Sequence, residues 1–160
     1  METIRTGLDF LDQEIHGFRR GKPYLIFGNP GCGKSSLGVQ YAAAGLERGE
    51  HVLYVYHGRG EELLELATKL GFRFDTYLEN ESLILIEVDD EVRTLVQQRS
   101  PEVALDALRQ QFNDAKVQRV VFDPVNVFFS ELHNEALLRA DIWAITSRLE
   151  PLGWTPLMLW

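Results

Sequence analysis

Residues 28–35 read Gly-Asn-Pro-Gly-Cys-Gly-Lys-Ser and match the pattern G-x-x-x-x-G-K-[ST] in full. This pattern predicts a phosphate-binding loop only where it follows a strand and opens a helix. The preceding segment, 23–27, is short and apolar and predicts a buried strand, while residues 35–48 contain no proline and predict a helix. The surroundings therefore favour a phosphate-binding loop over a glycine-rich turn that matches by chance.

Each residue type in this loop has a physical role in holding phosphate. Glycines let the backbone turn its N–H groups inward as an anion-binding nest, and the following helix adds its positive N-terminal end. In this pattern Lys34 reaches the β- and γ-phosphates, which also makes it a catalytic candidate, and the Ser35 hydroxyl binds Mg²⁺. The residues expected to bind nucleotide are Gly28, Asn29, Pro30, Gly31, Cys32, Gly33, Lys34, Ser35 and Ser36.

The rest of the chain alternates between short apolar stretches and amphipathic ones. The pattern predicts strands at 51–56, 82–88, 117–123 and 154–160, and helices at 61–70, 101–115 and 134–149. A short helix is expected near residues 8–15, capped by Gly17, and the acidic, polar segment 89–100 is expected on the surface. Alternating strands and helices predict an α/β fold, a three-layer sandwich with a mostly parallel sheet.

No internal repeat, low-complexity tract or interdomain linker interrupts the 160 residues. An apolar content of 45% is enough to bury a core at this length. We therefore expect one nucleotide-binding domain over 1–160, in which residues 1–22 form an N-terminal flap beside the first strand and residues 23–160 form the core.

An acidic residue, Asp123, ends the predicted strand 117–123. An acid at the end of an apolar strand downstream of a phosphate-binding loop is the second half of a nucleotide site, because it holds Mg²⁺ directly or through water. The predicted metal ligands are therefore Ser35 and Asp123. The alternative is that Asp123 serves only as a turn or helix-cap residue, a common use of aspartate.

The composition narrows the classes of partner. A formal charge of −8 and a pI of about 5.0 argue against nucleic acid, and the basic residues 19, 20 and 22 are better explained as a solvated turn. No apolar run is long enough to cross a bilayer, so no membrane insertion is expected.

The single cysteine, Cys32, excludes an internal disulfide and suits the cytoplasm. We interpret it as a small residue that fits the loop, with oxidation that blocks nucleotide binding as the alternative.

Several motifs together resemble KaiC-type domains of the RecA-like P-loop ATPases. The resemblance covers nearly the whole chain and implies a RecA-like core that binds ATP and Mg²⁺, often in a ring with nucleotide between neighbouring subunits. The choice of ATP comes from this resemblance alone. The motifs are Thr6-Gly7, Leu8-Asp9 or Leu11-Asp12, Gly17-Phe18 and Gly21 before the loop, the loop at 28–36, and the segments 52–56, 69–71 and 120–123 after it.

The sequence departs from the family pattern after the strand 51–56. Members of the family usually carry a glutamate pair there, one of which orients the attacking water, whereas this chain has His57-Gly58. Glu61 and Glu62 follow, where we interpret them as favourable charge at a helix start. The expected function is therefore ATP·Mg²⁺ binding with weak or no hydrolysis, as a nucleotide-dependent switch or assembly module. The alternative is an active ring-forming ATPase in which Glu61, Glu62 or His57 orients water.

A second departure concerns length. In the family the strand after the acidic one inserts between that strand and the phosphate-loop strand, and further strands follow. Here residues 155–160 would be the inserted strand and the later strands would be missing. We therefore expect either a fragment of a longer domain, or a partner protein or second copy that completes the sheet. Two further functions rank below the switch and the active ATPase. A small-molecule phosphotransferase is disfavoured because the arginines form no cluster, and a DNA-strand role is disfavoured because the chain is acidic.

Overall fold

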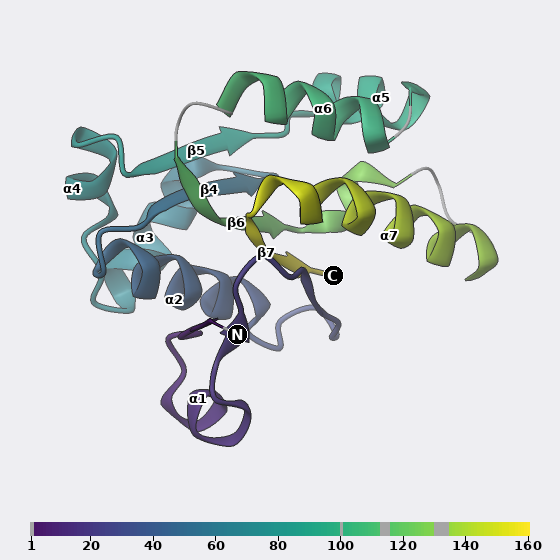
Figure 1. Cartoon of the computed structure of the whole chain (residues 1–160). Helices are drawn as coiled ribbons and strands as arrows, with labels where there is room; N and C mark the ends of the chain where they lie inside the picture. The colour runs from purple at the N-terminus through teal and green to yellow at the C-terminus, as the bar shows by residue number, and fades with distance from the viewer. Residues whose placement is uncertain (1, 100, 113–115, 130–134) are drawn as a thin grey trace.

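The computed structural model describes residues 2–99, 101–112, 116–129 and 135–160. Its centre is a sheet of five parallel strands in the order β3-β7-β6-β4-β5 (Figure 1). The strand that follows Asp123 in the chain, β7, lies between β6 and β3, as the resemblance implied. The strands are β3 (Tyr24–Ile26), β4 (His51–Tyr56), β5 (Leu83–Glu87), β6 (Val117–Asp123) and β7 (Thr155–Leu159).

Helices cover both faces of the sheet, which confirms the three-layer α/β prediction. One face carries α2 (Lys34–Leu46), α3 (Gly60–Lys69) and α4 (Phe74–Glu79). The other carries α5 (Asp90–Arg99), α6 (Pro101–Phe112), α7 (Glu135–Leu149) and the short 3₁₀ helices η1 (Val125–Phe128) and η2 (Glu150–Leu152). The sheet thus separates two apolar cores, a consequence of strands that are hydrophobic on both sides.

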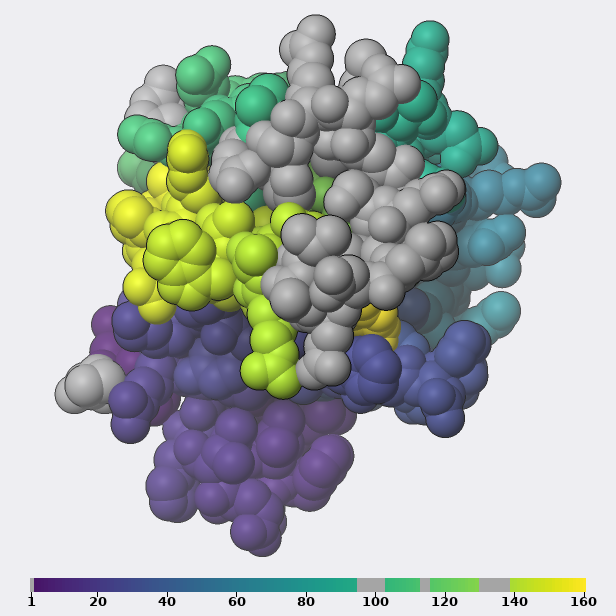
Figure 2. Space-filling view, turned by 90° about the vertical axis from the view of Figure 1, so that its right-hand side faces the viewer, coloured from purple at the N-terminus to yellow at the C-terminus, as the bar shows by residue number. Residues whose placement is uncertain are grey.

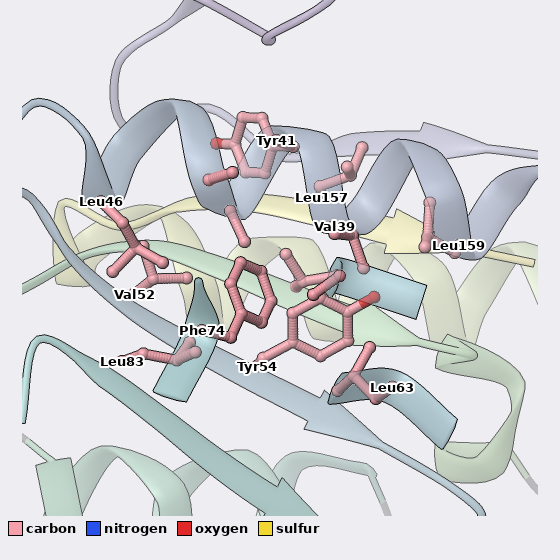
Figure 3. Packing of buried hydrophobic residues seen from close by; sticks show 14 of the residues in the cluster. Val39, Tyr41, Leu46, Val52, Tyr54, Leu63, Phe74, Leu83, Leu157 and Leu159 are labelled. Atoms are coloured by element: carbon pink, nitrogen blue, oxygen red, sulfur yellow. The ribbon is translucent and has the colours of Figure 1, made fainter. Parts of the chain in front are cut away.

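The first core lies between α2 and the sheet (Figure 3). The helix comes close to the strands because it presents small residues toward them. A Cβ added to Gly38 would lie 2.7 Å from the Tyr54 hydroxyl oxygen, and one added to Gly45 would lie 2.6 Å from Arg119 side-chain atoms. These glycines weaken the helix in isolation, but here they make room for two long polar side chains that rise from the sheet.

The N-terminal segment forms a lobe that protrudes from the body, purple in Figure 2. Its strands β1 (Thr3–Ile4) and β2 (Phe18–Arg19) pair antiparallel around α1 (Asp9–Ile15). The lobe is fixed beside the first strand of the main sheet, since the Phe18 and Tyr24 rings stack at 3.8 Å and the Gly21 N–H donates to the Thr155 hydroxyl at 2.9 Å. Its helix ends at Ile15 and is capped by His16 in the left-handed conformation, one residue before the expected cap Gly17.

Asp12, from the Leu11-Asp12 pair that precedes the phosphate-binding loop, makes tertiary contacts. Its Oδ1 accepts hydrogen bonds from the Thr6 backbone N–H at 2.8 Å and from the Thr6 hydroxyl at 2.9 Å. Thr6 is fully buried. Gly7, at φ +89°, then crosses α2 so closely that a Cβ would lie 2.6 Å from the Gln40 carbonyl oxygen. The Thr-Gly and Leu-Asp pairs therefore fix the turn that attaches the lobe to α2.

We predict that Asp12→Ala lowers the free energy of unfolding by about 1–3 kcal/mol, since it leaves the buried Thr6 N–H without an acceptor. Asp9→Ala on the same helix is the matched control, because Asp9 is exposed, and it is expected to cost no more than about 0.5 kcal/mol. Urea unfolding of both variants measures the difference. Equal losses would contradict this role of Asp12.

The largest difference from the sequence prediction is α5, because residues 90–99 form a helix where only a polar surface segment was expected. Asp89 begins it, since its Oδ1 accepts from the Val92 N–H at 2.7 Å. Helix α4 was also missed. At the described residues the other predicted elements agree with the structure to within two residues, and β4 and β6 agree at both ends. Positions 113–115 and 134 of the predicted helices lie outside the described residues. Among the described residues, no helix is long and apolar enough to span a bilayer.

Candidate functional site

The phosphate-loop sequence connects β3 to α2 at the carboxyl end of the sheet. Gly31 and Gly33 adopt φ of +79° and +93°, in the left-handed region that favours glycine. The Gly28 N–H donates to the Trp160 carbonyl at 3.1 Å, which joins the loop to the end of β7. Gly33 is the N-cap of α2, so the loop leads directly into the positive end of that helix.

The Lys34 side chain lies along the inside of its own loop. Its Nζ donates to the carbonyl oxygens of Gly28 at 2.7 Å and Asn29 at 2.8 Å. The Cys32 Sγ lies 3.8 Å from the same ammonium, and Cys32 is a free, exposed thiol. The Lys34 ammonium therefore lies against the backbone of the loop, at the position where the pattern expects a phosphate contact.

The Ser35 and Asp123 side chains meet across the sheet edge, although 88 positions separate them in the chain. The Ser35 hydroxyl donates to Asp123 Oδ1 at 3.2 Å. The Asp123 Oδ2 accepts from the Tyr54 hydroxyl at 2.9 Å. Burial, with the nearby Asp123 carboxylate adding to it, raises the pKa of Tyr54 well above its ordinary value, so the phenol stays protonated and donates.

A cleft of about 580 Å³ opens over these groups. Its size suits a small-molecule ligand, and its floor consists of the loop backbone, one ammonium and hard oxygen donors. Residues from the loop, from the ends of β4 and β6, and from α3 line it: Pro30, Gly31, Gly33, Lys34, Ser35, Ser36, Tyr56, His57, Arg59, Glu62, Leu63, Leu66, Asp123 and Pro124.

The residues present fit a magnesium ion that is shared with phosphates. The Ser35 and Asp123 oxygens are the hard ligands that Mg²⁺ prefers, and Mg²⁺ usually binds through one or two protein groups plus phosphate and water oxygens. The described residues contain no group of three or more His, Cys, Asp or Glu that could hold a metal by themselves. A metal here would therefore depend on phosphate and water oxygens for the rest of its coordination.

The three candidate water-orienting residues differ in position. His57 and Glu62 line the cleft, whereas Glu61 is not among its lining residues. The His57 Nδ1 lies 2.6 Å from the Val88 carbonyl oxygen, which can only accept, so Nδ1 carries a proton. The other ring nitrogen, Nε2, is then an acceptor whenever the imidazole is neutral. Glu61 and Glu62 both lie in the first turn of α3, where their charge favours the helix.

Sequence reasoning missed several residues at this site. Tyr54 was interpreted only as part of a strand, and Tyr56, Arg59 and Pro124 were not assigned to the cleft. A tyrosine on a buried strand carries no signal that its hydroxyl is used, because that depends on the facing helix residue, here Gly38. The position of Arg59 in the loop after β4 was the one available signal, since ligands bind beyond the carboxyl ends of parallel strands.

The strand order, the glycine loop and the converging Ser35 and Asp123 side chains define a RecA-like P-loop core. A family model described as the KaiC ATPase matches residues 4–160. The chain therefore belongs to the KaiC ATPase family, a family of nucleotide-binding ATPases.

The chain is similar to curated proteins of two kinds. It is 28% identical to the circadian clock protein KaiC2 of Synechocystis sp. over 94% of this chain and 27% of that protein, and 30% identical to KaiC3 of the same organism over 99% and 32%. It is also 30% identical to the DNA repair protein RadA of Aquifex aeolicus, over 92% of this chain and 29% of that protein. The chain thus spans about a third of the length of these relatives.

Proposed function

We propose that this chain is an ATP·Mg²⁺-binding domain with weak or no hydrolysis, which acts as a nucleotide-dependent switch or assembly module. The observation that carries the proposal is the cleft in which the Lys34 ammonium, the Ser35 hydroxyl and the Asp123 carboxylate converge, beside a strand end that carries His57-Gly58. The groups expected to bind phosphate are thus present, whereas the strand end beside them carries His57-Gly58 in place of the family's glutamate pair. Binding without efficient turnover follows from that combination.

In this proposal the residues of the loop, 28–36, hold the phosphates through backbone N–H groups, and the Lys34 ammonium contacts the β- and γ-phosphates. To do so it exchanges its two carbonyl acceptors in the loop for phosphate oxygens. Ser35 and Asp123 hold Mg²⁺, which neutralises phosphate charge when it is bound. Adenine is proposed from the family, because the lining residues include no hydrogen-bonding pattern specific for one base.

The alternative, an active ATPase, has specific support. His57 is held by Val88 with Nε2 free to accept, an arrangement that suits a general base, and Glu62 lines the same cleft. Glu61 has less support, since it is not among the lining residues. The switch proposal is favoured because Glu62 lies on the first turn of α3, where its charge has a structural role, and His57 is exposed.

The experiment is to identify the nucleotide that the protein retains. Purified protein is incubated with ATP and Mg²⁺, separated from free nucleotide, denatured, and the released nucleotide is identified by chromatography. Intact ATP is the expected result. Recovery of ADP would support the alternative, and the absence of any bound nucleotide would contradict both.

If ADP is recovered, three variants identify the group responsible. His57→Ala, Glu62→Gln and Glu61→Gln each remove one candidate, and Glu65→Gln, an exposed glutamate of the same helix that does not line the cleft, is the matched control. Loss of a water-orienting general base lowers turnover by about 10²–10⁴-fold. The variant that retains intact ATP then identifies the residue needed for hydrolysis.

We further propose that residues 1–160 act as one domain, with residues 1–22 as a flap on the core, and that it works in a reducing cytoplasm, which suits the exposed thiol of Cys32. A second copy or a partner protein that completes the sheet is proposed at the edge strand β3, where Leu25 in the strand is 37% exposed and Phe27, directly after it, is 75% exposed. Between a role like that of the circadian clock proteins and one like that of the DNA repair protein, the first is favoured, because a net charge of −8 does not suit contact with nucleic acid.

A further inference from the structure

The Asp123 carboxylate is held from two sides by residues of different elements. Ser35, in the first turn of α2, donates to Oδ1 at 3.2 Å, and Tyr54, in the middle of β4, donates to Oδ2 at 2.9 Å. Ser35 belongs to the phosphate-loop pattern. Tyr54 does not, and no motif in the sequence assigns it a function.

The position of Tyr54 is closely determined by its surroundings. It is fully buried in the core between α2 and the sheet, where Figure 3 shows its ring beside Val39 and Leu63. Its strand lies next to β6, with Tyr54 paired to Val121 and Tyr56 to Asp123. The hydroxyl reaches Asp123 along the underside of α2, and it fits there because residue 38 is glycine.

This contact has a consequence for the carboxylate. The terminal torsion of an aspartate side chain is broad, so a carboxylate that accepts one hydrogen bond can rotate about its last bond. A second donor on the opposite oxygen restricts that rotation. With Oδ2 bound to Tyr54, Oδ1 is the oxygen that faces Ser35 and the loop.

We propose that Tyr54 is a positioning residue of the magnesium site: its hydroxyl holds Asp123 Oδ2 so that Oδ1 is presented, together with the Ser35 hydroxyl, to the metal. The inference rests on the proposed function and extends it to a buried residue that does not contact the ligand. Hydrogen-bond partners of metal ligands commonly act in this way, and their loss typically weakens metal binding by about 10–100-fold.

The test is the Mg²⁺ dependence of nucleotide binding in Tyr54→Phe. Affinity for a non-hydrolysable ATP analogue is measured by calorimetric titration over a series of Mg²⁺ concentrations and in EDTA. In Tyr54→Phe the Mg²⁺ concentration needed for half of the effect is expected to rise by about 10-fold or more, while the affinity in EDTA stays the same. Asp123→Ala gives the reference for complete loss of the Mg²⁺ effect.

Tyr41→Phe is the matched control for loss of a buried hydroxyl. Tyr41 is also fully buried in the same core, but its hydroxyl donates to the Thr155 carbonyl oxygen at 2.8 Å, at the opposite end of β7 from the loop. Both variants lose one buried hydrogen bond and are expected to lose similar stability. Only Tyr54→Phe is expected to change the Mg²⁺ requirement.

A second variant reaches the same hydrogen bond from the helix. In Gly38→Ala the new Cβ would lie 2.7 Å from the Tyr54 hydroxyl oxygen and 2.9 Å from the Leu159 Cδ1, so neighbouring atoms must shift. We expect the same rise in Mg²⁺ requirement as in Tyr54→Phe. The double variant Gly38→Ala/Tyr54→Phe is expected to need no more Mg²⁺ than Tyr54→Phe alone, because the contact is already lost.

The outcomes separate the two proposals. A wild-type protein whose nucleotide affinity does not respond to Mg²⁺ would overturn the proposed metal site and the role of Tyr54 together. A wild-type protein that responds, with Tyr54→Phe behaving like Tyr41→Phe, would overturn the role of Tyr54 alone. A raised Mg²⁺ requirement in Tyr54→Phe and Gly38→Ala supports it.

Discussion

Lys34→Ala is expected to abolish measurable ATP binding while the protein stays folded. The ammonium is the charge that the loop directs at the phosphates, and its loss removes charge-assisted hydrogen bonds worth about 1.5–3 kcal/mol each. Two such bonds correspond to a loss of at least about 100-fold in affinity. Calorimetric titration with ATP and Mg²⁺ measures the loss, and circular dichroism and urea unfolding measure the fold.

The fold is expected to survive because the half-buried Lys34 side chain contacts its own loop rather than the core. Among the described residues, its Nζ bonds to the Gly28 and Asn29 carbonyl oxygens and to the Cys32 sulfur, all within the loop itself. Lys69→Ala is the matched control: Lys69 is an exposed helical lysine in a surface ion pair with Glu65, and its replacement is expected to leave ATP affinity unchanged. Unchanged affinity in Lys34→Ala would contradict the central proposal.

The loop was predictable because all of its information is contiguous. Eight consecutive residues carry the glycines, the lysine and the serine, and the flanking apolar and helical segments confirm the context without knowledge of the fold. The positive φ angles of Gly31 and Gly33 then follow from the residue type. The residue types and the backbone conformation of the loop are both determined locally, so the loop could be predicted without knowledge of any tertiary contact.

The approach of Ser35 to Asp123 was predictable for a different reason. Parallel strands end at the same edge of the sheet, and this edge is where ligands bind in α/β folds. Once 23–27 and 117–123 were both predicted as strands of one parallel sheet, their carboxyl ends had to lie near one another. The family resemblance added that the strand 155–160 lies between these two strands, and the structure confirms that position for β7.

Residues whose role depends on a facing element could not be predicted. Tyr54 and the His57–Val88 contact depend on how closely α2 and β5 approach β4, and neither distance is encoded locally. Helix α5 was missed because its sequence is too polar to show an apolar face, so only Asp89 marked its start. Arg119 gave a stronger signal, a charge inside an apolar strand, but its partners lie far away in the chain.

Arg119 is the most deeply buried charge among the described residues, with no exposed surface. Its Nε donates to Glu50, its Nη1 donates to the carbonyl oxygens of Arg5 at 2.7 Å and Tyr41 at 3.1 Å, and its guanidinium lies 4.7 Å from the centre of the Tyr41 ring. Glu50 also accepts from Arg20 at 3.0 Å. One carboxylate therefore joins β6, the end of α2 and the N-terminal lobe.

Glu50→Gln is expected to be the most destabilising conservative substitution at this cluster. It leaves the Arg119 guanidinium buried without a counter-charge, and removing one partner of a buried ion pair costs about 3–5 kcal/mol. The Arg119 Nη2 already has no hydrogen-bond partner among the described residues, so little is available to compensate. Urea unfolding measures the loss, and Glu47→Gln, an exposed glutamate three residues earlier, is the matched control.

A double-mutant cycle separates the charge from the packing. Arg119→Met keeps most of the side-chain volume and leaves Glu50 paired with Arg20, so it is expected to cost less than Glu50→Gln. The combination Arg119→Met/Glu50→Gln removes the unpaired charge and is expected to be less destabilised than the sum of the single variants, by at least about 1 kcal/mol. Additive losses, or a Glu50→Gln loss no larger than that of Glu47→Gln, would show that Glu50 does not stabilise the buried Arg119 charge.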